Sequence, residues 1–246
     1  MEPILEVDLS GKSFPAAGQA PPRAVLGPVR FSLGPGEVVA LTGPSGSGKT
    51  TLLNIVADLD PSYEGRIVRR AQNLAYVFQE PRLLPWRTVE ENLALVLPET
   101  AASPSRIVAA LEEVGLGEAR SSFASRLSLG MARRVALARA FIIEPDLLLL
   151  DEPFASLDGP TARRLRLLLL ELLARRRTAA LFVTHDLGEA VMLASRILVL
   201  GGSPATIQLD RAVSLSRAER LDPAVVAAFT CALDLGSEIG LLAEMA

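Results

Sequence analysis

The sequence predicts an α/β protein built on a mainly parallel sheet, with antiparallel strands near its N-terminus and an inserted α-helical subdomain. Three observations predict this fold class. Short apolar runs alternate with Gly and Pro breaks over the first forty residues, strands and helices alternate again from residue 147 to 200, and residues 81–140 have helical periodicity. Alternating strands and helices imply a parallel sheet that is covered on both faces.

The first half of the chain is expected to contribute strands and one helix. Apolar runs bounded by Gly and Pro predict the strands, and one of these runs feeds straight into a glycine-rich turn. After that turn, apolar residues recur at helical spacing. The expected strands cover residues 4–9, 24–33, 37–42, 65–69 and 74–78, and the expected helix covers residues 49–58.

Helices dominate the middle of the chain, and strands alternating with helices follow. Thr88 and Ser103 stand where helix N-caps are expected, because their hydroxyls can accept a backbone N–H of the first turn. Helices are expected over residues 88–96, 104–114, 130–143, 159–175 and 187–194, and strands over 147–150, 179–184 and 197–200. We therefore expect one domain over residues 1–210, with the helical subdomain at about 81–140 inserted in it, and a helical tail over 211–246.

Composition excludes several classes of protein. The 246 residues include 25 Lys and Arg against 28 Asp and Glu, a net charge of −3 that argues against general nucleic-acid binding. Half of the residues are apolar, yet no charge-free apolar run reaches the ~18 residues that cross a bilayer, and no secretion signal is recognised. The one cysteine, Cys231, is expected to be a buried small side chain in a reducing compartment. A soluble cytosolic protein is expected.

The glycine-rich turn fits the phosphate-binding motif G-x-x-x-x-G-K-S/T, and it follows an apolar strand and opens a helix, as that motif requires. Its glycines let backbone N–H groups curl around phosphate oxygens, and the helix N-terminus adds partial positive charge. We expect Lys49 to reach the β- and γ-phosphates of a nucleotide and the Thr50 hydroxyl to ligate Mg²⁺. This P-loop predicts a P-loop NTPase (RecA-like) core, whose candidate nucleotide contacts are Gly43, Pro44, Ser45, Gly46, Ser47, Gly48, Lys49, Thr50 and Thr51.

An acidic pair, Asp151 and Glu152, follows the leucine run at residues 147–150. An isolated pair of this kind is more often a helix start, but a P-loop in the same chain favours a catalytic interpretation. We expect Asp151 to hold Mg²⁺, directly or through water. Glu152 is then available to take a proton from the attacking water.

Four further segments make the chain resemble the ATP-binding cassette (ABC) ATPases. Their order and spacing fit that family over residues 4–210. The resemblance implies a nucleotide-binding domain that closes head to tail with a second copy around two ATP molecules. The matching segments are the Q-loop glutamine Gln79, the signature segment Leu127-Ser128-Leu129-Gly130-Met131, the D-loop Ser156-Leu157-Asp158, and Thr184-His185-Asp186 with the only histidine.

The resemblance implies a role for each matching residue. His185 would hydrogen-bond the γ-phosphate and orient Glu152 and the water, and a packed histidine is the alternative. Gln79 would sense Mg²⁺ or the water, as a third member of the metal set with Thr50 and Asp151. Phe14 would stack on adenine, and an exposed loop phenylalanine is the alternative.

The remaining roles concern the second copy. Ser128 and Gly130 would meet the partner copy's γ-phosphate, and Asp158 would lie at the dimer seam, where it can also cap a helix. Leu129 and Met131 depart from the usual Leu-Ser-Gly-Gly-Gln of the family, and we expect hydrolysis to survive this change. The arginines that follow, Arg133, Arg134 and Arg139, are expected to form a solvated helix face.

Residues 80–89, Glu-Pro-Arg-Leu-Leu-Pro-Trp-Arg-Thr-Val, resemble the run that follows the Q-loop in import ATPases of the nitrate/sulfonate/taurine group. An apolar patch with the only tryptophan, Trp86, suits a groove that accepts a helix of a membrane permease. Alternatively, Leu83, Leu84 and Trp86 seal the core of the helical subdomain.

The resemblance therefore implies an ATPase subunit that powers import of a small solute through a separate permease, with a solute-binding protein as an indirect partner and no nucleic acid. Its expected location is the cytoplasmic face of the inner membrane. The alternatives are an exporter or lipid-extraction ATPase, a non-transport ABC ATPase, or a catalytically weak subunit paired with a better partner. The transported solute is chosen by the permease and the binding protein, so the sequence does not identify it.

Overall fold

The computed structural model describes residues 2–16, 22–98 and 103–243, with side chains up to Leu233. The chain forms two compact units. The P-loop unit contains the glycine-rich turn and consists of Leu5–Leu33, Glu37–Arg69 and Leu181–Ala246. The signature unit contains the signature segment and consists of Met1–Ile4, Gly34–Gly36 and Arg70–Ala180.

The N-terminal strands of the P-loop unit pair antiparallel, as the sequence predicts. The central strand β1 pairs with β2, β3 and β5. Alternate residues of β3 are buried and exposed, because one face of the strand packs on the core. The run predicted as a strand over 24–33 is two strands. The bounds are β1 Leu5–Phe14, β2 Arg23–Leu26, β3 Val29–Leu33 and β5 Glu64–Arg69.

The other strands of the P-loop unit position the glycine-rich turn. Strand β4 (Val38–Thr42) runs into that turn and pairs parallel with β9 (Arg196–Gly202). Strand β10 (Ala205–Ala212) pairs antiparallel with β9 and was not expected. Its residues are mostly exposed or half-buried, so it lacks the apolar run that predicts a buried strand.

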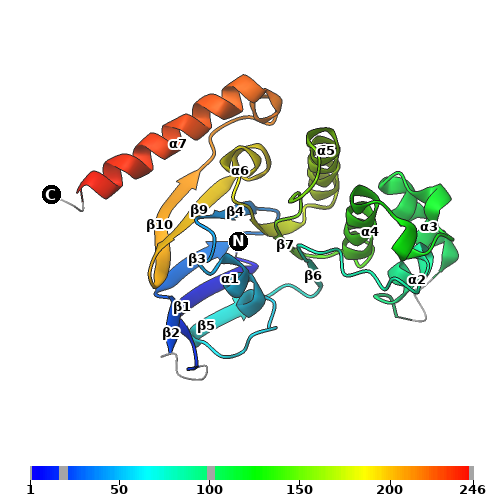
Figure 1. The fold of residues 1–246 in the computed structure, drawn as a ribbon, viewed down its shortest axis with the longest axis horizontal. Helices are drawn as coiled ribbons and strands as arrows, with labels where there is room; N and C mark the ends of the chain where they lie inside the picture. The colour runs from blue at the N-terminus through cyan, green and yellow to red at the C-terminus, as the bar shows by residue number, and fades with distance from the viewer. Residues whose placement is uncertain (1, 17–21, 99–102, 244–246) are drawn as a thin grey trace. The chain divides into compact units, whose positions relative to one another are not determined.

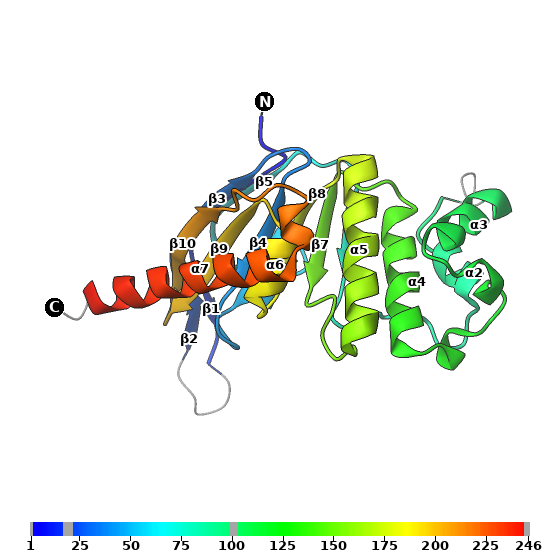
Figure 2. The same ribbon diagram turned by 90° about the horizontal axis from the view of Figure 1, so that it is seen from above.

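Three helices complete this unit: α1 (Lys49–Val56), α6 (Leu187–Leu193) and α7 (Pro223–Ala243). Helices α6 and α7 lie on one side of strands β4, β9 and β10 (Figures 1 and 2). The tail is mainly helical, as expected, with a short 3₁₀ turn at Glu219–Leu221 before α7. The expectation that Cys231 is buried is wrong, because its side chain lies on the exposed face of α7.

The signature unit contains a parallel strand pair and the predicted helices. Strands β6 and β7 pair in register, with Val77 opposite Leu150. The Thr88 hydroxyl and the Glu91 carboxylate form a capping box at α2, and the Ser103 hydroxyl caps α3, so both predicted N-caps are confirmed. The bounds are β6 Leu74–Val77, β7 Leu147–Asp151, α2 Val89–Ala94, α3 Pro104–Glu113, α4 Leu129–Phe141 and α5 Gly159–Arg176; β8, Ala179–Val183, leads back into the P-loop unit.

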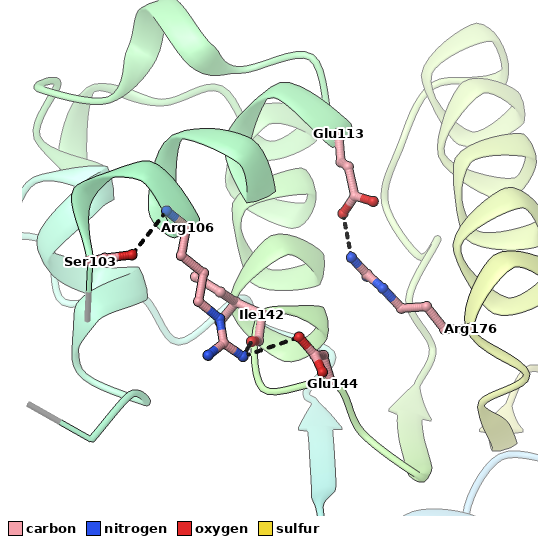
Figure 3. A network of polar contacts seen from close by, with 6 residues as sticks. All are labelled: Ser103, Arg106, Glu113, Ile142, Glu144 and Arg176. Atoms are coloured by element: carbon pink, nitrogen blue, oxygen red, sulfur yellow. Dashed lines mark hydrogen bonds and ion pairs between the residues drawn. The ribbon is translucent and has the colours of Figure 1, made fainter. Parts of the chain in front are cut away.

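Within the signature unit, α4 packs against α5 on one side and against α2 and α3 on the other (Figure 2). Helix α3 is tied to its neighbours at both ends (Figure 3). Arg106 donates to the Ile142 carbonyl at 2.7 Å and pairs with Glu144 at 3.3 Å, while Glu113 pairs with Arg176 of α5 at 2.6 Å. These partly exposed pairs add specificity to an apolar contact that already holds the helices together.

Among the described residues, no helix combines the length and the apolarity needed to cross a membrane. The division into a domain over residues 1–210 and a tail over 211–246 stays a prediction.

Candidate functional site

The P-loop is shaped by glycines at which a side chain does not fit. Gly43 has a φ of +140°, and a Cβ built there would lie 2.2 Å from the Leu200 carbonyl oxygen. Gly48 is the left-handed N-cap of α1 with a φ of +89°, and a Cβ there would lie 2.7 Å from the Leu26 side chain. A Cβ at Gly46 would meet no described atom within 4 Å. The loop is therefore tightly fixed at its ends and open in its middle.

Two polar side chains of the P-loop are buried in positions that suit an anion. Lys49 is 6% exposed, and its ammonium donates to the carbonyl oxygens of Gly43 and Pro44, at 2.8 Å each. The Ser47 hydroxyl is buried, and it has no hydrogen-bond partner among the described residues. Because buried polar groups are normally paired, an unpartnered hydroxyl in this loop fits a site that a phosphate oxygen completes.

His185 follows β8 in a turn that its neighbours fix. The Thr184 hydroxyl donates to the Glu189 carboxylate at 2.7 Å, and the Asp186 carboxylate caps α6 by accepting the Glu189 N–H at 3.1 Å. One cavity of about 340 Å³ in the P-loop unit is lined by His185 together with Gly43, Pro44 and Ser45. The structure thus places the predicted switch histidine beside the start of the P-loop.

Phe14 is the last residue of strand β1 and is not the loop residue that the alternative interpretation expected. Its ring is 41% exposed and lies 4.6 Å from Lys12 Nζ, measured to the ring centroid. Lys12 itself is 4% exposed and donates to Asp60 Oδ1 at 2.7 Å and to the Ser62 carbonyl at 2.6 Å. The ring therefore rests on a fixed cation, and its exposed part is suited to stack on an aromatic base.

Replacing Phe14 with Ala is expected to weaken ATP binding by about tenfold, because stacking on a base contributes ~1–3 kcal/mol. Lys12→Met should weaken it in the same direction, since the ring loses its support. Calorimetric titration with ATP and with inorganic tripolyphosphate checks the cause. Tripolyphosphate has no base, so its affinity should change by less than about twofold; an equal loss for both ligands would contradict base stacking.

Gln79, Asp151 and Glu152 lie at or just after the ends of two paired strands of the signature unit. Because Val77 of β6 lies opposite Leu150 of β7, the chain segments after both strands leave the sheet at the same edge. Asp151 is 5% exposed, whereas Glu152 is partly buried and has a left-handed φ of +42°. The structure thus brings together the three predicted residues of this unit.

Tyr76 of β6 lies close to this acidic edge. Burial raises the pKa of the Tyr76 phenol, and the charge of Asp151 raises it further, while Arg82 opposes the rise. The phenol therefore stays neutral near pH 7 and adds no charge to this edge.

The signature segment is presented outward at the start of α4. Ser128 is exposed and caps the helix, its hydroxyl accepting the Met131 N–H at 3.3 Å. Leu129 is 41% exposed and is the first residue of the helix, where the backbone tolerates any side chain. Gly130 has no such freedom, because a Cβ there would lie 2.7 Å from the Thr161 side chain. The leucine therefore fits the local backbone without strain.

Asp158 of the D-loop caps α5, and its carboxylate accepts the Thr161 N–H at 3.0 Å. Hydrogen bonding with the Thr161 side chain, and then with its backbone N–H, lowers the pKa of the exposed Asp158 carboxyl. The helix-cap role is confirmed, and the expected role at a dimer seam stays a prediction.

The expectation that the arginines of α4 form a solvated face is wrong. Burial lowers the pKa of all three guanidinium groups, and all three donate to backbone carbonyls of loops. Helix α4 is buried on most of its circumference by small and apolar residues, which leaves no solvated face. The carbonyls belong to residues 152–155 for Arg133, residues 114–115 for Arg134 and residues 81–82 for Arg139.

Asn92, a fully buried residue of α2, was not predicted from the sequence. Its amide donates to the carbonyls of Leu84 and Thr88 at 3.2 and 2.9 Å and accepts the Leu84 N–H at 2.8 Å. These bonds shape the loop that carries Trp86, which is 69% exposed, while Leu83 packs against the helical core. Leu83 therefore seals the core and Trp86 does not. The sequence signal that could have identified Asn92 is an amide side chain among the apolar positions of a predicted helix.

Comparison with known proteins agrees with this arrangement of motifs. The chain matches a family model described as "ABC transporter" over residues 26–155, more than half of its length. It is 40% identical over 234 residues to "Aliphatic sulfonates import ATP-binding protein SsuB 2" of Burkholderia cenocepacia, covering 87% of each chain. It is 49% identical over 179 residues to a protein of the same name from Paracoccus denitrificans, covering 73% of this chain and 72% of that one.

Among solved structures, the dimeric ATP-binding cassette MJ0796, bound to ADP and Pi in a post-hydrolysis state, has a TM-score of 0.75 and 26% identity. The match covers 86% of this chain and all of that chain. The family model, the relatives and this likeness agree with the motifs that the two units carry. The chain belongs to the ABC transporter family of ATP-binding cassette proteins.

Proposed function

We propose that this chain is the ATP-hydrolysing subunit of an importer that moves a small solute of the aliphatic sulfonate type through a separate membrane permease. The observation that carries the proposal is the P-loop, where Lys49 is braced, the Ser47 hydroxyl is unpartnered among the described residues, and His185 lines the same cavity as the start of the loop. The relatives are named as sulfonate import proteins, which favours import over export.

In this proposal Lys49, His185 and Glu152 act on one ATP. Lys49 stabilises the charge that develops on the β- and γ-phosphates, and His185 holds the γ-phosphate. Glu152 accepts a proton from water as the water oxygen bonds to the γ-phosphorus and the bond to the ADP oxygen breaks.

Thr50, Gln79 and Asp151 are the residues proposed to hold Mg²⁺. A hydroxyl, an amide oxygen and one carboxylate form a hard oxygen set of the kind that Mg²⁺ shares with substrate phosphates. Bound there, the ion supplies positive charge toward the phosphate oxygens.

A second copy of the chain is proposed to complete each ATP site, with Ser128 and Gly130 facing the γ-phosphate held by the other copy. The exposed N-terminus of α4 supports this role, and the structurally similar MJ0796 cassette is dimeric. The permease is proposed to dock at the loop that carries Trp86, which places the protein on the cytoplasmic face of the inner membrane.

Trp86→Ala is expected to reduce permease-stimulated ATP turnover by tenfold or more, because a buried aromatic anchor contributes ~2 kcal/mol or more to an interface. Basal turnover of the isolated protein should stay the same, since Trp86 is 69% exposed on the free chain. Turnover measured with and without the permease in proteoliposomes checks this, and Leu59→Ala is the matched control because Leu59 is 58% exposed in the P-loop unit. Unchanged stimulation would show that the permease docks elsewhere.

The proposed function itself is tested in the same proteoliposomes. They contain a permease for aliphatic sulfonates, with its solute-binding protein added on the side opposite the ATPase. ATP should drive uptake of a labelled aliphatic sulfonate, and ADP should not. ATP hydrolysis without uptake of any sulfonate would exclude the solute class, while absence of hydrolysis would exclude the ATPase function.

A further inference from the structure

Arg133 is the most enclosed arginine of helix α4. Its side chain is 5% exposed, and it lies five residues after Ser128, the cap of the same helix. Its Nη1 donates to the carbonyls of Glu152 at 3.1 Å and Pro153 at 2.6 Å, and its Nη2 donates to the Ala155 carbonyl at 2.6 Å. One guanidinium therefore gathers three carbonyls of the turn that begins at Glu152.

The turn needs this support, because its backbone is strained. Glu152 and Ser156 both have left-handed backbones, with φ of +42° and +61°, although neither is glycine. Within the turn, the Ala155 N–H donates to the Glu152 carbonyl at 3.2 Å, a long bond. Charge-assisted hydrogen bonds are stronger than neutral ones, so the three bonds from Arg133 hold this turn more firmly than its own long backbone bond does.

The orientation of the Arg133 side chain also indicates that it supports the turn. Its Nε is buried and has no hydrogen-bond partner among the described residues. Burial also lowers the pKa of its guanidinium, while the charge of Glu152 opposes that effect. The Arg133 side chain therefore leaves its Nε without a hydrogen bond, while Nη1 and Nη2 both donate to the turn.

We infer that Arg133 is a positioning residue for hydrolysis, which holds the backbone of Glu152 so that its carboxylate is aimed at the attacking water. This inference rests on the proposed function, in which Glu152 is the general base. A general base that is displaced by about 1 Å can lose on the order of a hundredfold in rate. Ser128, in the signature segment, caps the helix that carries Arg133. Through this helix, Arg133 also connects the signature segment to the turn at Glu152.

The test compares Arg133→Gln, Arg133→Lys and the matched control Arg134→Gln in the full-length protein. Arg134 lies next to Arg133 on α4 but donates to the carbonyls of Val114 and Gly115. Arg133→Gln should lower kcat for ATP by about 10- to 100-fold with KM changed by less than about twofold. Arg133→Lys should recover part of kcat, because the charge returns without the fork. Arg134→Gln should keep kcat within about threefold of wild type.

A double-mutant cycle separates positioning from a purely structural role. If Arg133 acts through Glu152, then adding Arg133→Gln to Glu152→Gln should lower single-turnover cleavage by less than about twofold further. Losses that multiply would overturn the inference, as would a kcat of Arg133→Gln equal to that of Arg134→Gln. If Arg133→Gln does not fold, Arg133→Lys takes its place in the cycle.

The outcomes also distinguish this inference from the proposed function. Turnover that is lost in Glu152→Gln but normal in Arg133→Gln overturns the inference alone. A wild-type protein without turnover, or Glu152→Gln as fast as wild type, overturns the proposed function.

Discussion

Glu152→Gln is expected to lower ATP turnover by about 10²- to 10⁴-fold, the range that general-base catalysis supplies. Glutamine keeps the size and the polar character of the side chain but cannot accept the proton of the attacking water. ATP binding should persist, because the phosphate contacts come from the P-loop and not from this residue. The measurement is steady-state phosphate release beside the Kd for ATP.

Glu80→Gln is the matched control for this change. Glu80 is an exposed carboxylate of the same unit that follows Gln79, so it tests loss of a negative charge without loss of the base. Its turnover should stay within about threefold of wild type. A Glu152→Gln protein that still releases phosphate at the wild-type rate would assign the base to another group.

Lys49→Ala is expected to reduce both ATP affinity and turnover, the affinity by about tenfold or more and the turnover by about 10³-fold. The ammonium has two functions in this account. It braces the loop through the carbonyls of Gly43 and Pro44, and it supplies the positive charge that the phosphates need. Calorimetric titration with ATP and with ADP, beside phosphate release, measures both functions.

Lys49→Arg separates the two functions. It retains the charge, but the planar guanidinium does not reproduce the compact ammonium between two carbonyls. We expect affinity close to wild type and turnover still reduced by about 10-fold or more. Equal affinity and turnover for wild type and Lys49→Ala would contradict phosphate binding by the P-loop.

Helices and buried strands followed from the sequence because their signals are local. The hydroxyls of Thr88 and Ser103 cap helices where predicted, and the apolar run before the P-loop is strand β4. Strand β10 was not predicted, because its residues are mostly exposed or half-buried and therefore show no apolar period. The exposed Cys231 also did not follow, since its burial depends on which face of α7 packs.

Part of the candidate site was predicted from the sequence for the same reason. Contiguous motifs such as the P-loop carry their chemistry in one segment, so residue types and spacing were enough. Arg133 contacts carbonyls about twenty residues away in the chain, and backbone carbonyls leave no trace in a sequence. Asn92 is similar, because its partners are backbone groups of a loop. Such contacts need the folded structure.

Light scattering on Glu152→Gln with ATP and Mg²⁺ tests most directly whether Lys49 and Glu152 act on one ATP that a second copy of the chain also binds. We expect a particle with the mass of two chains that holds two intact ATP molecules, and we expect it to be lost when Lys49→Ala is added. An ATP-loaded Glu152→Gln protein that stays at the mass of one chain, or that yields ADP on extraction, would contradict it.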